Sequence, residues 1–298
     1  METILTEADW DTLLTRIANQ KCTPFLGAGI CFGILPLACD VAKKWANEFG
    51  YPLSDCSDLA RVAQFIAVER KDFVIPKMKI AELFKEIPPP NFKDPDEPHG
   101  ILADLPLPIY ITTNYDDFMV QALRDRGKDP KLVLCRWNRY IKDQKSGPSF
   151  ESRVKFKPSP ANPAVFHLHG YREVPESLVL TEDDYLDFLV NISQDQNLIP
   201  PSIQGALSSS LLFIGYRLTD WDFRVIFRGV IGSVENSLSG LNIAVQLPPN
   251  DKGIDQKKAQ EYLNKYFANT RIQVIWVTAK QFLSELKTRW EKKFGKKE

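Results

Sequence analysis

Short apolar runs alternate with longer stretches of helical periodicity along most of this 298-residue chain. Each apolar run is rich in β-formers and ends at Gly, Pro or polar residues, which is typical of buried strands. We expect strands at 23–26, 108–111, 132–135, 164–166, 177–180, 211–214, 241–247 and 271–277. Strands that alternate with helices predict an α/β fold, here a doubly wound, mostly parallel (Rossmann-like) sheet with helical insertions.

The helical stretches show apolar residues three and four positions apart. We expect helices at 6–19 with Thr6 as cap, 36–49 ending at Gly50, 57–69 with Ser57 as cap, 76–86 beginning at Pro76, 99–105, 117–123 and 279–294, with two more opening at Thr181 and Asp220. Residues 138–163 are expected to form a surface loop. We predict one domain over 1–298, with a helical insertion at about 37–107 and the C-terminal helix 279–294.

The composition excludes some classes of protein. Lys and Arg together number 38, as do Asp and Glu, so no net field attracts nucleic acid. The N-terminus lacks the apolar core of a signal peptide, and no apolar run approaches the roughly 20 residues of a membrane span. We therefore expect neither direct sequence-specific nucleic-acid binding nor a membrane anchor.

The five cysteines are odd in number, include no Cys-x-x-Cys pair and all precede residue 136. This usage predicts a reduced, cytoplasmic environment. It also excludes a four-cysteine zinc module in the second half of the chain, because the thiolate ligands are missing there.

Residues 108–118 carry the densest group of polar side chains at a strand end. The run Pro108–Ile111 is followed by Thr112-Thr113-Asn114-Tyr115-Asp116 and then by a helical pattern. Open α/β sheets place ligands at the carboxyl ends of their strands. The alternative is that these side chains only cap the following helix.

Three other expected strand ends carry unusual residues. Gly27-Ala28-Gly29 permits a tight turn that lets phosphate approach the backbone, although a plain strand-to-helix connection explains it equally. His169-Gly170 and Gly215-Tyr216 lie at the other two. His169 suits a general base because imidazole titrates near neutrality, whereas structural roles are expected for His99 and His167. A metal held by the two neighbouring histidines with Asp183 or Asp184 is a weaker alternative.

In this order, these four motifs resemble those of the sirtuin-like superfamily. The stretches from His99 to Asp116 and from Leu178 to Tyr185 are more closely similar to the bacterial sirtuin-like NAD hydrolases of antiphage defence. The resemblance extends from about Phe25 to Ile231.

The resemblance implies roles for particular residues. Ala28 with Gly27 and Gly29 would hold the pyrophosphate of NAD, and Asn114 would bind the nicotinamide ribose or the attacking water. His169 would be the catalytic histidine. The remaining implied cofactor contacts are Thr113, Asp116, Gly215, Tyr216 and Asp220.

Two departures from the sirtuin pattern bear on the acceptor. About 45 residues separate His169-Gly170 from Gly215, and none of them is cysteine, so the zinc module of deacylating sirtuins is absent. Water therefore becomes the expected acceptor. In addition, Ile30-Cys31 follows the glycines where sirtuins place a serine.

The resemblance implies an NAD hydrolase that releases nicotinamide and ADP-ribose as an NAD-depleting antiphage effector, with NAD as substrate and no metal. It also implies a homo-oligomer and an activating partner, either a helicase-type ATPase or a short Argonaute. The alternatives are an NAD-dependent protein deacylase, an ADP-ribosyltransferase and a non-catalytic nucleotide-binding module.

Overall fold

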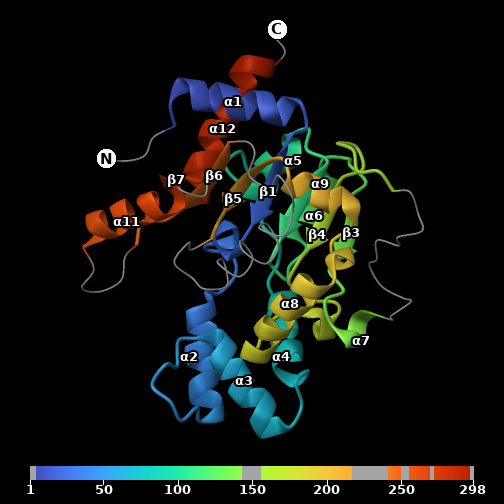
Figure 1. Ribbon diagram of the computed structural model, residues 1–298, viewed down its shortest axis with the longest axis vertical. Helices are drawn as coiled ribbons and strands as arrows, with labels where there is room; N and C mark the ends of the chain where they lie inside the picture. The colour runs from blue at the N-terminus through green and yellow to red at the C-terminus, as the bar shows by residue number, and fades with distance from the viewer. Residues whose placement is uncertain (1–4, 143–155, 217–240, 250–254, 269–271, 296–298) are drawn as a thin grey trace.

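The computed structural model describes residues 5–142, 156–216, 241–249, 255–268 and 272–295. Within them lies a seven-stranded sheet in the order β3-β4-β2-β1-β5-β6-β7, in which every neighbouring pair is parallel (Figure 1). The strands are β1 (Cys22–Leu26), β2 (Ile109–Thr112), β3 (Lys131–Leu134), β4 (Ala164–His167), β5 (Ser210–Ile214), β6 (Asn242–Gln246) and β7 (Ile272–Trp276). The predicted α/β fold with a doubly wound parallel sheet is confirmed.

The chain reverses direction across the sheet at β1. It passes from β1 to β2 on one side and later returns to β5 on the other, so Leu26 pairs with both Thr112 and Ile214. The carboxyl ends of these three strands are therefore adjacent. Doubly wound sheets bind their ligands at such a reversal.

Two layers of helices cover the sheet. One face packs against α1 (Glu7–Ala18), α5 (Pro98–Asp104), α6 (Phe118–Asp125) and α12 (Ala279–Phe294). The other packs against α8 (Glu182–Gln194), α9 (Pro201–Leu207) and α11 (Gln256–Ala268). Successive strand residues alternate between the two cores: Tyr110 lies on the α5 side and Ile111 on the α9 side.

Three helices between β1 and β2 form a separate core beyond the carboxyl edge of the sheet. They are α2 (Ala38–Phe49), α3 (Leu59–Arg70) and α4 (Ile75–Lys85), at the lower end of Figure 1. Their core includes Leu178 and Leu180, and Tyr115 packs against it. Lys77 Nζ lies 2.6 Å from Asp184 Oδ1 in a buried ion pair that joins α4 to α8.

The first and last helices lie side by side, as Figure 1 shows. The rings of Trp10 and Phe282 stack with centroids 5.3 Å apart. Arg289 bonds Glu7 at 2.8 Å, and Lys293 bonds Asp11 at 2.6 Å.

Helix ends follow local capping chemistry. The predicted caps Thr6 and Thr181 each form a capping box, and Gly50 ends α2 in the left-handed conformation. The predicted cap Ser57 is wrong by one residue. Asp58 begins α3 instead, because its carboxylate accepts hydrogen bonds from the N–H groups of Ala60 and Arg61.

The strand predicted at 177–180 is also wrong. Ser177 ends the 3₁₀ helix η2 (Pro175–Ser177), and the next residues are buried outside the sheet. Strand β4 is already paired on both sides, so this segment packs on the α2–α4 core. In the surface loop expected at 138–163, Arg139–Lys142 form the short helix α7, whereas residues 143–155 lie outside the described residues, as does the helix expected from Asp220.

Within the described ranges, no helix has both the length and the hydropathy that crossing a membrane requires. The number of domains stays a prediction.

Candidate functional site

The glycine motifs after β1 and β5 pack directly against each other. Gly27 N–H donates to Ile214 O at 2.9 Å, and Gly29 N–H donates to Gly215 O at 2.8 Å. Gly215 has φ +81°, and a Cβ there would lie 2.4 Å from Ile30 N. Close backbone approach therefore explains the need for these glycines without a ligand.

Because of this packing, the amides of the two glycines are not free to bind a phosphate, although the sequence suggests that they would be. The amides of Gly27 and Gly29 are already bonded, whereas Ala28 is exposed at the start of the 3₁₀ helix η1 (Ala28–Cys31). Phosphate binding by this turn stays a prediction, and Ala28 is its most accessible member.

Thr113 and Tyr216 meet over the end of β1. The Tyr216 hydroxyl donates to Leu26 O at 3.0 Å, and Thr113 Oγ1 lies 2.9 Å from that hydroxyl oxygen. Thr113 N–H also donates to Leu26 O at 3.0 Å. The structure thus brings together predicted residues that are far apart in sequence.

The backbone N–H and the side-chain Nδ2 of Asn114 both donate hydrogen bonds within the protein. Its N–H donates to Thr112 Oγ1 at 3.0 Å, and its amide Nδ2 donates to Gly27 O at 3.3 Å and Cys31 Sγ at 3.5 Å. The side chain is half-buried. In this orientation, Oδ1 is the atom offered to a ligand hydroxyl or water.

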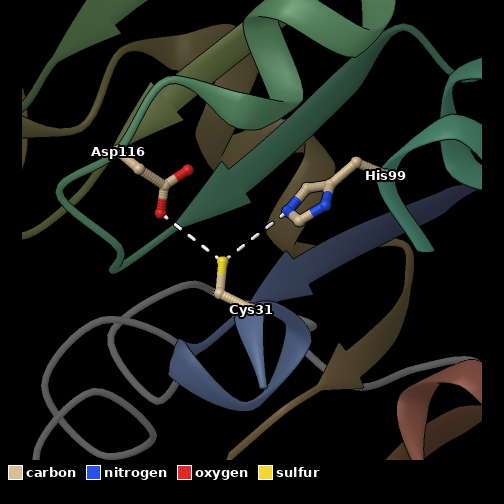
Figure 2. Close-up of side chains that lie close together, drawn as sticks. All are labelled: Cys31, His99 and Asp116. Carbon is tan, nitrogen blue, oxygen red and sulfur yellow. Dashed lines mark hydrogen bonds between the residues drawn. The ribbon is translucent and has the colours of Figure 1, made fainter. Parts of the chain in front are cut away.

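Asp116 belongs to a buried cluster with Cys31 and His99, shown in Figure 2. Cys31 Sγ donates to Asp116 Oδ2 at 3.6 Å and lies 3.9 Å from His99 Nε2. Burial raises the pKa of the Cys31 thiol well above its usual value, and the Asp116 carboxylate raises it further. Glu97 Oε1 lies 2.7 Å from His99 Nδ1.

The sequence patterns do not indicate this cluster, and they predict a structural role for His99. The sequence carries only local signals: a Glu-Pro-His sequence at a helix start, and a cysteine two residues after the glycine turn. Neither signal shows that three distant segments meet.

His169 lies on the α8 side of the site. Its ring is 3% exposed and packs edge-on against Tyr185 and Phe188, with centroids 5.6 and 4.9 Å away. Burial lowers its pKa to about 3. Its Nε2 is buried, and the described part of the chain supplies no hydrogen-bond partner for it.

His167 ends β4 opposite Thr112 and is also buried. Burial lowers its pKa to about 4, against the opposing charge of Asp116. Its ring packs on Tyr171 at 5.3 Å, and neither ring nitrogen has a hydrogen-bond partner among the described residues.

Most predicted site residues therefore form one network around the ends of β1, β2 and β5. His169 lies apart from it, after the neighbouring strand β4, and within the described ranges no hydrogen bond joins it to Asn114. Their convergence on one ligand stays a prediction. Asp220 lies outside the described residues.

A surface hollow of about 530 Å³ lies elsewhere, between α12 and the loop before α5. It contains none of the predicted site residues; Asp96, Thr278, Lys280, Gln281, Ser284, Glu285 and Thr288 line it.

Proteins with known names match this chain over most of its length. NAD(+) hydrolase ThsA of Bacillus cereus (strain MSX-D12) is 26% identical over 224 residues, which are 74% of this chain and 42% of that protein. NAD(+) hydrolase ThsA of Cytobacillus dafuensis is 33% identical over 188 residues, 62% of this chain and 32% of that protein. The chain thus spans less than half the length of these curated relatives.

A solved structure from a study of the mechanism and regulation of Sir2 enzymes covers 97% of this chain and 100% of its own, with a TM-score of 0.41 and 11% identity. The family model described as the SIR2-like domain matches residues 108–275, more than half of the chain. This chain is therefore a member of the SIR2-like domain family.

Proposed function

We propose that this chain hydrolyses NAD at the bond between nicotinamide and ribose, as the NAD-depleting effector of a bacterial antiphage system. Its membership of the SIR2-like family and its similarity to proteins named NAD(+) hydrolase support the proposal. The chain spans less than half the length of those relatives.

The unpartnered Nε2 of His169 is the observation that carries the proposal. A buried polar atom without a partner costs free energy, and a catalytic or binding role is one explanation for such an atom in a folded protein. Its lowered pKa keeps the imidazole neutral near pH 7, so a ring nitrogen can accept a hydrogen bond, although burial makes His169 a weaker base than the free imidazole that the sequence suggested. A water or ribose hydroxyl entering the site would supply the missing partner.

Asn114 has the complementary role. Its donor side is fixed by Gly27 and Cys31, so Oδ1 can accept from a ribose hydroxyl or from the attacking water. Loss of the positively charged pyridinium leaves a ribosyl centre with oxocarbenium character. The amide orients the water that attacks this centre, and His169 accepts the released proton.

The other side chains are proposed to hold NAD around these two residues. Ala28 and its flanking glycines would contact the pyrophosphate. Asp116 would help to position the nicotinamide side, Gly215, Tyr216 and Asp220 would contact the adenosine half, and Thr113 would be a further contact to NAD. The meeting of Thr113 and Tyr216 over β1 supports one continuous binding surface.

A fluorogenic NAD analogue tests the proposal. Asn114→Ala and His169→Gln are each expected to lower the rate at least about 100-fold, because each removes an orienting or proton-accepting group. Asn47→Ala, at an exposed position on α2, is the matched control. Variants as active as the wild type would remove the assigned roles.

Product analysis by mass spectrometry separates hydrolysis from transfer. Free ADP-ribose and nicotinamide support the proposal; ADP-ribose attached to protein, or loss of an acyl group from lysine, would replace it. Calorimetric binding of NAD without turnover, with the partner present, would favour a non-catalytic module.

Such an effector must be silent until it is triggered. We propose a cytoplasmic homo-oligomer activated by a helicase-type ATPase or a short Argonaute. Turnover and sedimentation, measured with and without each partner, test this part. Full activity of an isolated monomer would contradict it.

A further inference from the structure

Three ligand-type side chains from separate elements converge in the buried cluster of Figure 2. Cys31 ends η1, His99 lies in the first turn of α5, and Asp116 lies in the turn between β2 and α6. Their nearest ligand atoms lie within 4.8 Å of one another. We propose that Cys31, His99 and Asp116 bind a divalent ion of the zinc class, which pins these three elements together.

The partners behind two of the ligands match those of a metal site. Glu97 Oε1 accepts from His99 Nδ1 at 2.7 Å, and its other oxygen accepts the Gly100 N–H. Asp116 Oδ1 accepts the Phe118 N–H at 2.9 Å. A carboxylate behind a histidine fixes the tautomer that presents the other ring nitrogen to a metal. His99 Nε2 and Asp116 Oδ2 are thus the lone-pair atoms aimed at Cys31.

The number of protons in the cluster supports a cation. In the neutral tautomer of His99 that donates Nδ1–H to Glu97, both His99 Nε2 and Asp116 Oδ2 are acceptors facing Sγ. A thiol carries one proton and can satisfy only one of them. A divalent ion in place of that proton would satisfy both acceptors and the thiolate together.

Two of the three distances between ligand atoms are close to those around a tetrahedral ion, and the third is at most 4.8 Å. Zinc bonds of about 2.3 Å to sulfur and about 2.1 Å to nitrogen or oxygen place tetrahedral ligand atoms about 3.5 Å apart. The structure has 3.6 Å from Sγ to Asp116 Oδ2 and 3.9 Å from Sγ to His99 Nε2. Thiolate with imidazole and carboxylate favours zinc or cobalt over magnesium or calcium.

The ion would hold the Asn114 side chain in place and would not take part in the reaction itself. Asn114 Nδ2 already donates to Cys31 Sγ, and a metal-bound thiolate is a stronger acceptor than a thiol. The site would fix the amide orientation and the turn that carries it. Metal binding does not depend on the proposed hydrolysis and can be measured without turnover.

The test uses tag-free full-length protein with Cys39→Ser and Cys56→Ser, which removes the two thiols that are not buried. Cells are grown with cobalt or zinc so that the metal enters during folding. We expect about one ion per chain by elemental analysis and a thiolate-to-cobalt charge-transfer band in the cobalt protein. A metal-free protein, or cobalt without that band, would overturn the proposal.

Single variants identify the ligands. Cys31→Ser should abolish the band, and His99→Gln and Asp116→Asn should each lower the metal content. Glu97→Gln should weaken affinity by about 10- to 100-fold, because it acts through His99. Cys135→Ser, at another buried thiol, is the matched control and should keep both the band and the metal content. If Cys31→Ser does not fold, His99→Gln decides: retention of full cobalt content with an unchanged band would overturn the assignment.

Discussion

The two flanks of the candidate site differ in how their polar groups are satisfied. On the η1 flank, Asn114 and Asp116 each have hydrogen-bond partners within the protein. On the α8 flank, His169 keeps a buried ring nitrogen without a partner in the described part of the chain. Hydrogen bonds within the protein hold the side chains of the first flank in place. The second flank keeps a buried polar atom with which a ligand can form a hydrogen bond.

Lowering the pH should have the largest effect on the stability of the folded protein. The pKa values of His167 and His169 fall to about 4 and about 3 in the folded protein, from 6.5. Below pH 6.5 these histidines become protonated in the unfolded chain but stay neutral in the folded chain. The free energy of unfolding therefore falls as the pH falls toward those values. From pH 7 to pH 4 the two histidines should together cost on the order of 5 kcal/mol. His169→Leu should remove about half of this loss in urea denaturation, and an unchanged pH slope would contradict the buried, neutral histidine.

Gly215→Ala tests the η1 flank and should cost at least about 4 kcal/mol, because it combines a left-handed backbone with a steric clash. Its Cβ would meet Ile30 N at 2.4 Å. Gly33→Ala is the matched control: φ is +83°, but no atom lies within 4 Å of its Cβ, so about 1 kcal/mol is expected. Equal losses in urea denaturation would mean that backbone conformation, not the packing of the two turns, sets the cost.

Leucine substitutions compare the flanks directly. Asn114→Leu should cost about 2 kcal/mol, because it removes the donor to Gly27 O and Cys31 Sγ. His169→Leu should be neutral or stabilising by about 1 kcal/mol, because it removes an unsatisfied buried nitrogen. Both variants should lose NAD hydrolysis. Opposite signs in thermal unfolding would reverse the assignment of the η1 and α8 flanks.

Tyr216→Phe should have the smallest effect, about 1 kcal/mol. It removes the hydroxyl that donates to Leu26 O and meets Thr113, although Thr113 N–H still satisfies the carbonyl. Urea denaturation measures the loss, with Tyr140→Phe at an exposed ring as control. A larger loss than that of Asn114→Leu would mean that the end of β1 depends mainly on the tyrosine.

The sequence predicts the sheet because each strand is a local pattern, and it predicts the motifs because they follow the strands. Sequence patterns predict the wrong structure where two adjacent residues both suit the same role, or where contacts with distant segments determine the conformation. Ser57 and Asp58 both suit a helix cap, and only the backbone turn selects Asp58. The run at 177–180 has strand composition, but β4 offers it no free edge.

The site shows the same limit. The Gly27 and Gly215 motifs are visible in the sequence, yet their use of each other's backbone is not. The convergence of Cys31, His99 and Asp116 depends on three elements separated in the chain, so no local spacing reveals it.

Because α1 packs against α12, we expect the fold to tolerate a different order of its elements along the chain. Lys293 in the last turn of α12 reaches Asp11, one helical turn from Glu7, so the beginning and end of the described chain are neighbours. A circularly permuted gene, opened at the exposed turn between α3 and α4 and joined through a linker, should encode the same architecture.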